Sequence, residues 1–361
     1  MAYPANGNPS KSIYNSRFCS CPYSSFLNRL PMKVFRGLPN AASRAPCALT
    51  IGNFDGVHGG HQALLARVRA AATERGVEAA VMTFEPHPRE FFAQMAGDPS
   101  KAPTRIANLR DKLQSLSNNG VDRTIVEHFN ARFAAMPPQQ FIEKVLVEGL
   151  HVKWLMVGED FCFGARRAGN VATLLAASSQ YGFEVQTLPA IMEGGVRISS
   201  SAVRTALAAG DFPRAELLLG RPYAISGHVI HGKKLGRSLG FPTLNLLIRH
   251  KRPALSGIFV VRVHGLGGPD AAPLAGVASL GLRPTVDDSG RVLLETHVFD
   301  YRGDCYGKLV RIEFLQKLRD EEKYADLPSL AAAIDNDAER ARAWFRHTSG
   351  AGNARGATDR I

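Results

Sequence analysis

The chain contains little cysteine, and its cysteines are not spaced as metal ligands. No two form a Cys-x-x-Cys pair, and the five are Cys19, Cys21, Cys47, Cys162 and Cys305. A structural zinc site needs four ligands of the kind that such pairs supply, and a disulfide scaffold needs a higher density of cysteine. The pattern favours a reducing compartment, so we expect a cytoplasmic protein.

Long apolar runs are also missing, as are acidic residues near the start. No apolar run reaches the roughly 20 residues of a membrane-spanning helix, so we expect no membrane partner. Residues 1–54 contribute +6 and residues 346–361 contribute +2, which leaves +4 of the net charge of +12 for residues 55–345. A mildly basic folded part suits phosphate-bearing substrates as well as RNA. Because RNP and KH signatures are absent, we expect no nucleic-acid partner.

The two ends of the chain lack the periodicity of folded elements. Residues 1–31 are rich in Ser, Asn, Pro and Tyr. They are either a transit-like segment, since arginine and serine occur without acids, or an unordered stretch upstream of a natural start at Met32. We favour the second because no amphipathic helix or signal-peptide core is present. The Gly/Ala-rich tail 348–361 is predicted to be disordered.

The length of 361 residues predicts two domains, which we place at 32–210 and 220–347. In the first, strands alternate with helices, which predicts a parallel sheet covered on both faces. The predicted strands are 48–51, 79–84, 123–127, 153–157 and 183–187, and the helices are 61–75, 106–118, 138–148 and 172–181. In the second, short strands broken by Gly and Pro predict a small antiparallel barrel with a closing helix. These strands are 224–229, 258–263, 274–280, 293–299 and 309–315, and the helix is 329–346.

The segment Thr50-Ile-Gly-Asn-Phe-Asp-Gly-Val-His-Gly-Gly-His61 is the most informative pattern in the chain. It leaves a predicted strand, turns at Gly52 and Gly56, where the backbone can approach a ligand, and enters a helix. The N–H groups and dipole at a helix N-terminus favour an anion. His58 and His61 share one helix face and can donate hydrogen bonds to phosphates. A zinc pair or two solvated imidazoles are the alternatives, but the strand–turn–helix context favours a nucleotide site.

Two further segments follow predicted strands of the same domain. Phe84-Glu-Pro-His-Pro88 lies where ligands bind in parallel sheets, although its prolines are also explained by a rigid loop without a function. Val157-Gly-Glu-Asp-Phe-Cys-Phe-Gly164 leaves another strand, and Asp160 in it can contact a ribose or a base. Of Phe161 and Phe163, we expect one to face the core and one to face a ligand.

The segment Ile198-Ser-Ser-Ser-Ala-Val-Arg204 closes the first domain. One of its serines can cap the helix that begins there. The free N–H groups of that helix, the hydroxyls and Arg204 then form a second phosphate clamp. An ordinary N-cap explains the serines but leaves Arg204 without a role.

In the second domain, Gly232-Lys-Lys-Leu-Gly-Arg-Ser-Leu-Gly-Phe-Pro-Thr-Leu-Asn245 stands out. Its glycines recur every fourth residue in a basic setting, which suits a lid over polyphosphate. Thr243 and Asn245 alternate on a strand, so both face one way, and their oxygens suit Mg²⁺. Glu295 interrupts an apolar strand; it is either paired on an exposed face or able to take the proton of an attacking alcohol.

The four segments of the first domain, in this order and spacing, resemble the FMN adenylyltransferase module of bacterial bifunctional riboflavin kinase/FAD synthetases. That module has the Rossmann-like α/β fold of the HxGH nucleotidyltransferases. The resemblance implies that His58, His61 and Arg204 are catalytic and stabilise charge around the α-phosphate and the leaving pyrophosphate. The implied nucleotide- and phosphate-binding residues are Gly52, Phe54, Asp55, Gly56, Asp160, Ser199 and Ser200, and the implied flavin-binding residues are Phe84, Pro86, His87 and Phe163.

The second domain resembles riboflavin kinase, a small Greek-key barrel with a C-terminal helix. The resemblance implies that Glu295 is the catalytic base for the terminal ribityl hydroxyl and that Thr243 and Asn245 hold Mg-ATP. It also implies nucleotide binding by Gly232, Lys233, Gly236 and Gly240, and flavin binding by Arg283. Ser279 stands where the family commonly has Asn. A hydroxyl replaces one amide hydrogen bond but not two, so we expect a shifted affinity and retained activity.

Together the resemblances cover about residues 33–346 and imply a bifunctional enzyme. It phosphorylates riboflavin with ATP to FMN, then adenylylates FMN with a second ATP to give FAD and pyrophosphate. Mg²⁺ accompanies ATP, and FMN and FAD are substrate and product rather than redox cofactors. We expect riboflavin, FMN and ATP as partners and a monomer or weak homo-oligomer. The alternatives are a related transferase acting on a pantetheine phosphate or sugar phosphate, and an RNA-binding protein.

Overall fold

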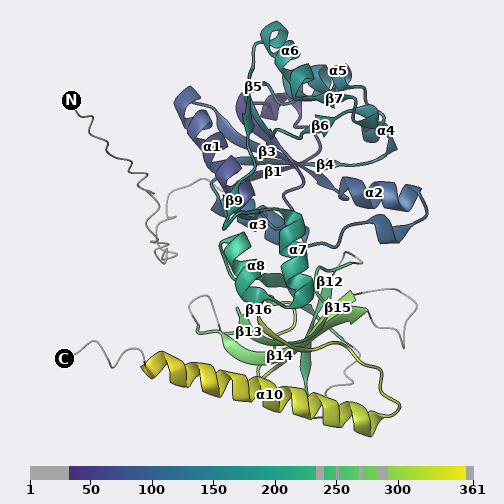
Figure 1. The fold of residues 1–361 in the computed structure, drawn as a ribbon, viewed down its shortest axis with the longest axis vertical. Coiled ribbons are helices and arrows are strands. Elements are labelled where there is room, and N and C mark those ends of the chain that lie inside the picture. The colour runs from purple at the N-terminus through teal and green to yellow at the C-terminus, as the bar shows by residue number, and fades with distance from the viewer. Residues whose placement is uncertain are drawn as a thin grey trace, which may run out of the picture. The chain divides into compact units, whose positions relative to one another are not determined.

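The computed structural model describes residues 32–232, 240–248, 250, 252–267, 271–282 and 292–354 (Figure 1). For residues 349–354 only the backbone is described. The expectations for 1–31, 355–361, Lys233, Gly236 and Arg283 therefore lie outside the described residues.

A six-stranded parallel sheet forms the centre of the first domain, in the strand order β1-β4-β3-β2-β5-β8 among the described residues. The strands are β1 (Lys33–Arg36), β2 (Cys47–Ile51), β3 (Glu78–Glu85), β4 (Arg123–His128), β5 (Val152–Gly158) and β8 (Glu184–Leu188). Every residue of β2 is buried, as expected for a central strand covered on both faces. The predicted parallel α/β sheet is confirmed, and β1 is a strand that we did not predict.

Helices cover both faces of this sheet (Figure 1). Alternate residues of β2 join different cores: Ala48 packs in one with α1 (Gly59–Arg75), and Leu49 packs in the other with Phe141 and Ile142. The remaining elements of the domain are η1 (Ala41–Ser43), α2 (Pro88–Met95), η2 (Pro99–Lys101), α3 (Leu109–Asn118), α4 (Ala131–Ala134), α5 (Pro138–Gln140), the π-helix η3 (Phe141–Val147), β6 (Cys162–Phe163), η4 (Ala165–Arg167), β7 (Gly169–Asn170), α6 (Val171–Tyr181), β9 (Met192–Glu193), β10 (Val196–Arg197), α7 (Ser200–Ala209) and α8 (Phe212–Leu219).

One predicted helix begins later than expected. We predicted a helix from Ile106, but α3 starts at Leu109, because Asn108 caps it by accepting a hydrogen bond from the Asp111 amide at 2.8 Å. The amides of Ile106 and Ala107 instead donate to Asp55 on the other side of the sheet edge. A local N-cap and a tertiary contact together set where this helix begins.

The second domain is a closed antiparallel barrel in the order β11-β12-β15-β14-β13-β16. Its strands are β11 (Ala224–Ile230), β12 (Thr243–Ile248), β13 (Gly257–His264), β14 (Leu274–Leu282), β15 (Val292–Val298) and β16 (Leu309–Arg319). β12 pairs with β15 rather than with β13, its neighbour in sequence. This order is the predicted Greek key.

Helices join the barrel at two places. α7 and α8 share one hydrophobic core with the barrel interior, in which Phe212 packs against Phe259 and Phe314. The closing helix α10 (Leu327–Ala354) places Ala338 and Ala341 against Val260 and Val277 of the barrel wall. It continues past the predicted end at Arg346, so residues 348–354 are helical rather than irregular.

The two domains also meet through polar contacts. The backbone at Arg105 pairs with the β12–β13 connection, since the Arg105 amide donates to the Arg252 carbonyl at 2.7 Å and the Ala254 amide donates to the Arg105 carbonyl at 2.9 Å. The Arg252 guanidinium donates to carbonyls of the 99–102 loop. No helix in the described ranges is long and apolar enough to span a membrane.

Candidate active sites

The turn between β2 and α1 has an unusual backbone. Phe54, Gly56 and Val57 have φ of +48°, +85° and +44°, and the first and last are uncommon for residues with a side chain. A Cβ atom at Gly56 would lie 2.7 Å from Ile106 Cγ2, so the position needs glycine for space as well as for its φ. Phe54 is fully buried, and its ring lies beside His61, with centroids 4.8 Å apart. The turn leads into the N-terminus of α1.

His58 and His61 meet at this N-terminus. Their rings stack with centroids 3.8 Å apart. His58 is the N-cap, and its Nδ1 accepts a hydrogen bond from the His61 amide at 3.4 Å, which leaves Nε2 to carry the ring proton. Burial lowers the pKa of His58 to about 4 and holds that of His61 well below its usual value. Both rings are therefore neutral hydrogen-bond donors at pH 7, not cations.

Asp55 is directed into the protein. It is 1% exposed and forms an ion pair with Arg204 at 2.7 Å. Its carboxylate also accepts hydrogen bonds from the Ile106 and Ala107 amides at 3.2 Å. Burial would raise the pKa of Asp55, but Arg204 and these amides outweigh burial and lower it. We expected Asp55 to bind the nucleotide; its geometry gives it the role of holding Arg204 and the start of α3.

The serine segment is arranged as predicted. Ser199 is the N-cap of α7 and accepts a hydrogen bond from the Ala202 amide at 3.2 Å. Ser200 donates to the Asp55 carbonyl at 3.1 Å, which fastens α7 to the β2–α1 turn. Arg204 donates through Nε to the Thr104 carbonyl at 2.7 Å and through Nη2 to Asp55. Two helix N-termini and Arg204 therefore lie near the carboxyl end of β2, an arrangement that suits an anion.

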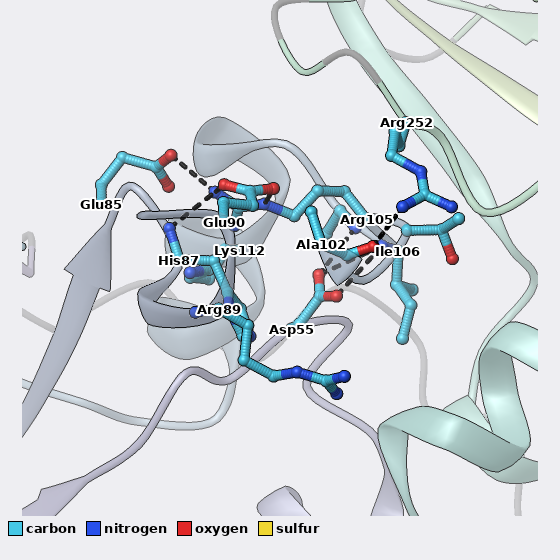
Figure 2. Close-up of polar contacts among 12 residues, drawn as sticks. Asp55, Glu85, His87, Arg89, Glu90, Ala102, Arg105, Ile106, Lys112 and Arg252 are labelled. Carbon is cyan, nitrogen blue, oxygen red and sulfur yellow. Dashed lines mark hydrogen bonds and ion pairs between the residues drawn. The ribbon is translucent and has the colours of Figure 1, made fainter. Parts of the chain in front are cut away.

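Behind this site lies a buried network of opposite charges, shown in Figure 2. Arg105 is 3% exposed and pairs with Glu85 and Glu90, each at 2.6 Å. The buried Lys112 approaches the Thr83 hydroxyl at 3.4 Å, and burial lowers its pKa to about 8. Charges buried in this way are tolerated only when they are paired, so the network fixes the segment after β3 in one position.

His87 has a structural place in this segment. It is buried and is the N-cap of α2. Its Nδ1 accepts a hydrogen bond from the Arg89 amide at 3.1 Å. The Glu90 carboxylate in turn accepts one from the His87 amide at 3.2 Å. Burial lowers the pKa of His87 to about 3. The Phe84–Pro88 segment is thus a helix entry as well as a sheet-edge loop, and α2 was not predicted.

Aromatic rings gather beside the same edge. Phe84 is half-buried and contacts Phe129 and Phe133, each with ring centroids 5.8 Å apart. Of the alternating pair, Phe163 is 7% exposed and belongs to the core, whereas Phe161 is half-buried and stacks on it at 5.7 Å. We predicted that Phe163 contacts the flavin. Because Phe163 is buried and Phe161 is half-buried, Phe161 is the better candidate for this contact.

Two arginines near the turn were not singled out from the sequence. Arg197 in β10 pairs with Asp160 at 3.3 Å, both side chains being exposed, and its charge helps to lower the pKa of His58 after burial and Arg204. Arg221 donates to the carbonyls of Gly56 and Val57. Arg197 stands directly before the serine motif, which was a usable signal; the contacts of Arg221 have no local signal.

The kinase residues form a row across three barrel strands. Asn245 of β12 and Ser279 of β14 are both register partners of Glu295 in β15, so the three lie side by side on one face. Thr243, two residues before Asn245 on β12, is the register partner of His297 on β15. The Ser279 hydroxyl donates to Glu321 at 3.2 Å, a carboxylate that we did not predict. Burial raises the pKa of Glu321, and Glu295 adds to this effect.

Asn245 fits a hard cation. Its side chain is buried, and Oδ1 has no hydrogen-bond partner among the described residues. An orphaned buried oxygen beside a carboxylate is the donor set that Mg²⁺ prefers. The Gly232 backbone approaches Asn245 so closely that a Cβ atom there would collide with its amide, while Gly240 has φ +86° and no neighbour at its Cβ position. These two glycines flank the predicted lid.

The comparisons with known proteins agree with the family resemblance of both domains. A family model described as FAD synthetase matches residues 40–202, and one described as riboflavin kinase matches residues 219–345. A relative from Escherichia coli, described as a bifunctional riboflavin kinase/FMN adenylyltransferase, is 46% identical over 317 residues, which cover 87% of this chain and 98% of the relative. The chain belongs to this family. A Pseudomonas fluorescens member is 44% identical over 86% of this chain and 97% of its own length.

A solved structure shares the fold of the family. The crystal structure titled as a macrolide-efflux protein from Streptococcus pneumoniae aligns with a TM-score of 0.63 at 25% identity, over 88% of this chain and all of that chain. Membership confirms the predicted order of an FMN adenylyltransferase domain followed by a riboflavin kinase domain. It leaves the roles of individual residues to be argued from the geometry.

Proposed function

We propose that the β2–α1 turn performs the adenylyl transfer of this bifunctional riboflavin kinase and FMN adenylyltransferase, and that the Glu295 row performs its kinase reaction. The observation that carries the first assignment is the stacked, neutral His58–His61 pair at a helix N-terminus. The one that carries the second is the alignment of Asn245, Glu295 and Ser279 in register.

In the adenylyl transfer, an oxygen of the FMN phosphate attacks the α-phosphorus of ATP. A P–O bond to FMN forms, the α–β P–O bond breaks, and pyrophosphate leaves with the electron pair. The FMN phosphate is already an anion, so no base is needed. His58 Nε2–H, Arg204 and the N–H groups of α1 stabilise the charge that develops on the transferred group.

In the kinase reaction, the terminal ribityl hydroxyl of riboflavin attacks the γ-phosphorus of ATP. The new O–P bond replaces the β–γ bond, ADP leaves, and Glu295 accepts the hydroxyl proton. Thr243 and Asn245 would hold Mg²⁺, which supplies neutralisation of the phosphate charge when bound. Ser279 donates a hydrogen bond to Glu321, a carboxylate whose pKa is raised by burial and, in part, by Glu295.

The remaining assignments follow from these two reactions. We propose ATP, riboflavin and FMN as the small-molecule partners, with Phe84, Pro86 and Phe161 lying beside the flavin. We also propose a monomeric or weakly associating protein of the cytoplasm. The domain limits 32–210 and 220–347 are part of the same proposal.

Two sets of variants test the two-site assignment. Glu295→Gln should reduce FMN formation from riboflavin by about 10²–10⁴-fold, the usual contribution of a general base, and leave FAD formation from supplied FMN unchanged. His58→Ala combined with His61→Ala should do the opposite. Each variant is the control for the other, with flavins separated by chromatography. Loss of both activities in either variant would contradict the assignment.

A further inference from the structure

Arg221 belongs to the riboflavin kinase half of the chain but contacts the other half. It lies just beyond α8, inside the segment that matches riboflavin kinase, 219–345. Its Nη2 donates to the Gly56 carbonyl at 2.6 Å, and its Nη1 lies 3.2 Å from the carbonyls of Val57 and Leu219. The side-chain amide of Gln62 donates to two of the same carbonyls, to that of Val57 at 2.9 Å and to that of Leu219 at 2.7 Å.

These carbonyls belong to the turn that presents the catalytic histidines. In a trans peptide the C=O and the following N–H lie on opposite edges of one plane. When Arg221 holds the carbonyls of Gly56 and Val57, the amides of Val57 and His58 are directed away from Arg221. Two N–H donors and the N-cap imidazole are thus oriented by one guanidinium.

The turn needs such a hold. Its positive φ angles at Phe54 and Val57 are unfavourable for residues with a side chain. A charged donor bonded to two carbonyls opposes that tendency to relax. The positive charge of Arg221 also contributes, after burial and other charges, to the low pKa of His58. Arg221 therefore acts both on the backbone shape of the turn and on the electrostatic potential at His58.

We propose that Arg221 is a positioning residue for adenylyl transfer, contributed by the kinase segment to the active site of the neighbouring domain. This inference rests on the proposed role of the β2–α1 turn. Arg221 touches neither substrate; it acts through Gly56, Val57 and His58. Adenylyl transfer then depends on the docking of the chain that begins the kinase domain.

The test compares Arg221→Met and Arg221→Lys in the full-length protein. Arg221→Met should lower kcat for FAD formation from FMN and ATP by about 10–100-fold, with kcat and KM for riboflavin phosphorylation within about 2-fold of the unmodified chain. Arg221→Lys retains one hydrogen bond and the charge, so it should recover part of the lost kcat. The matched control is Arg252→Met, which removes another kinase-segment arginine bonded to the first domain but not to the turn.

The outcomes separate the proposal from its rivals. Unchanged adenylyl transfer in Arg221→Met would overturn it, and so would a parallel fall of both activities, which indicates a merely structural role. An equal loss of adenylyl transfer in Arg252→Met would also overturn it. If Arg221→Met does not fold, Arg221→Lys alone decides by a selective fall in kcat. If the unmodified protein makes no FAD from FMN, the proposed function itself fails.

Discussion

Asp55 illustrates how a single carboxylate can serve a nucleotide site without facing the nucleotide. A carboxylate aimed at a triphosphate would repel it, whereas Asp55 points into the protein and pairs with Arg204 at 2.7 Å. The guanidinium also donates to the Thr104 carbonyl, so two partners fix its position. The position of Arg204 is therefore set in part by a buried acid.

We predict that Asp55→Asn lowers the free energy of unfolding by about 3–5 kcal/mol, as expected when one partner of a buried ion pair is removed. The Asn amide would also face the Ile106 and Ala107 amides, donor against donor. Urea unfolding measures the loss. In the double variant with Arg204→Met, the loss should be smaller than the sum of the single losses; strict additivity would show that the pair is not the cause.

The buried histidines predict an acid-sensitive stability. Burial lowers the pKa of His58 and His250 to about 4 and that of His87 to about 3. The unfolded chain then binds more protons than the folded one between pH 6.5 and 4. The stabilisation is complete above pH 6.5 and is lost as the pH falls through this window, by up to about 1.4 kcal/mol per pH unit for each histidine.

Urea unfolding at pH 7.5, 6 and 5 measures this dependence. His250→Gln should flatten the fall in stability with decreasing pH, because one of the buried imidazoles is removed. His228→Gln serves as the control, since His228 is exposed and bonds to the Gly307 carbonyl. Equal pH dependences in the two variants would contradict the assignment of the effect to buried imidazoles.

At the scale of the element, the β2–α1 turn and α1 show how differently two glycines can matter. Gly56 combines φ +85° with a neighbour, Ile106, 2.7 Å from a potential Cβ atom. Gly76, the C-cap of α1, also has a positive φ, +62°, but nothing within 4 Å. The first is required for backbone shape and for space, the second for backbone shape alone.

Gly56→Ala should therefore destabilise the protein by about 2–5 kcal/mol, the sum of left-handed strain and overpacking, and should reduce adenylyl transfer. Gly76→Ala should cost only about 1–2 kcal/mol and leave both activities intact. Thermal unfolding and the two separate assays measure these effects. Equal losses of stability would show that Ile106 gives way and that space at Gly56 is not limiting.

At the scale of the whole molecule, one group of contacts between the domains joins the barrel to the 99–102 loop. Arg252 Nη1 lies 2.8, 2.6 and 2.5 Å from the carbonyls of Pro99, Ser100 and Ala102, as Figure 2 shows for Ala102. The loop leads directly to Arg105 and to the amides that hold Asp55. The barrel and the adenylyl-transfer site are thus joined through a short stretch of chain.

Arg252→Ala should weaken this connection by about 1.5–3 kcal/mol, the range for hydrogen bonds from a charged group. The chain has two tryptophans, Trp154 in β5 and Trp344 in α10, so each domain carries one probe. With Trp344→Phe and Trp154→Phe backgrounds, the two unfolding transitions should coincide in the parent and separate after Arg252→Ala. Transitions that stay together at an unchanged midpoint would count against this connection.

The sequence by itself determined the two domain types and, through the family resemblance, the Greek key and the candidate site residues. The periodicity of apolar residues and the turn residues are local features of the sequence. They therefore predicted the alternation of strands and helices and the shared face of Thr243 and Asn245 on one strand. The motifs around His58, Ser199 and Glu295 are short and continuous, and the family resemblance supplied their chemistry. Each of these features depends on residues that are close in the chain.

The tertiary structure alone decided which charged groups pair and which side chains are buried. Asp55 meets Arg204 at a separation of 149 residues, and Arg221 meets Gly56 at 165. The late start of α3 and the burial of Phe163 also depend on distant partners. Side-chain burial and the pairing of charges are properties of the packed chain, and no local pattern encodes them.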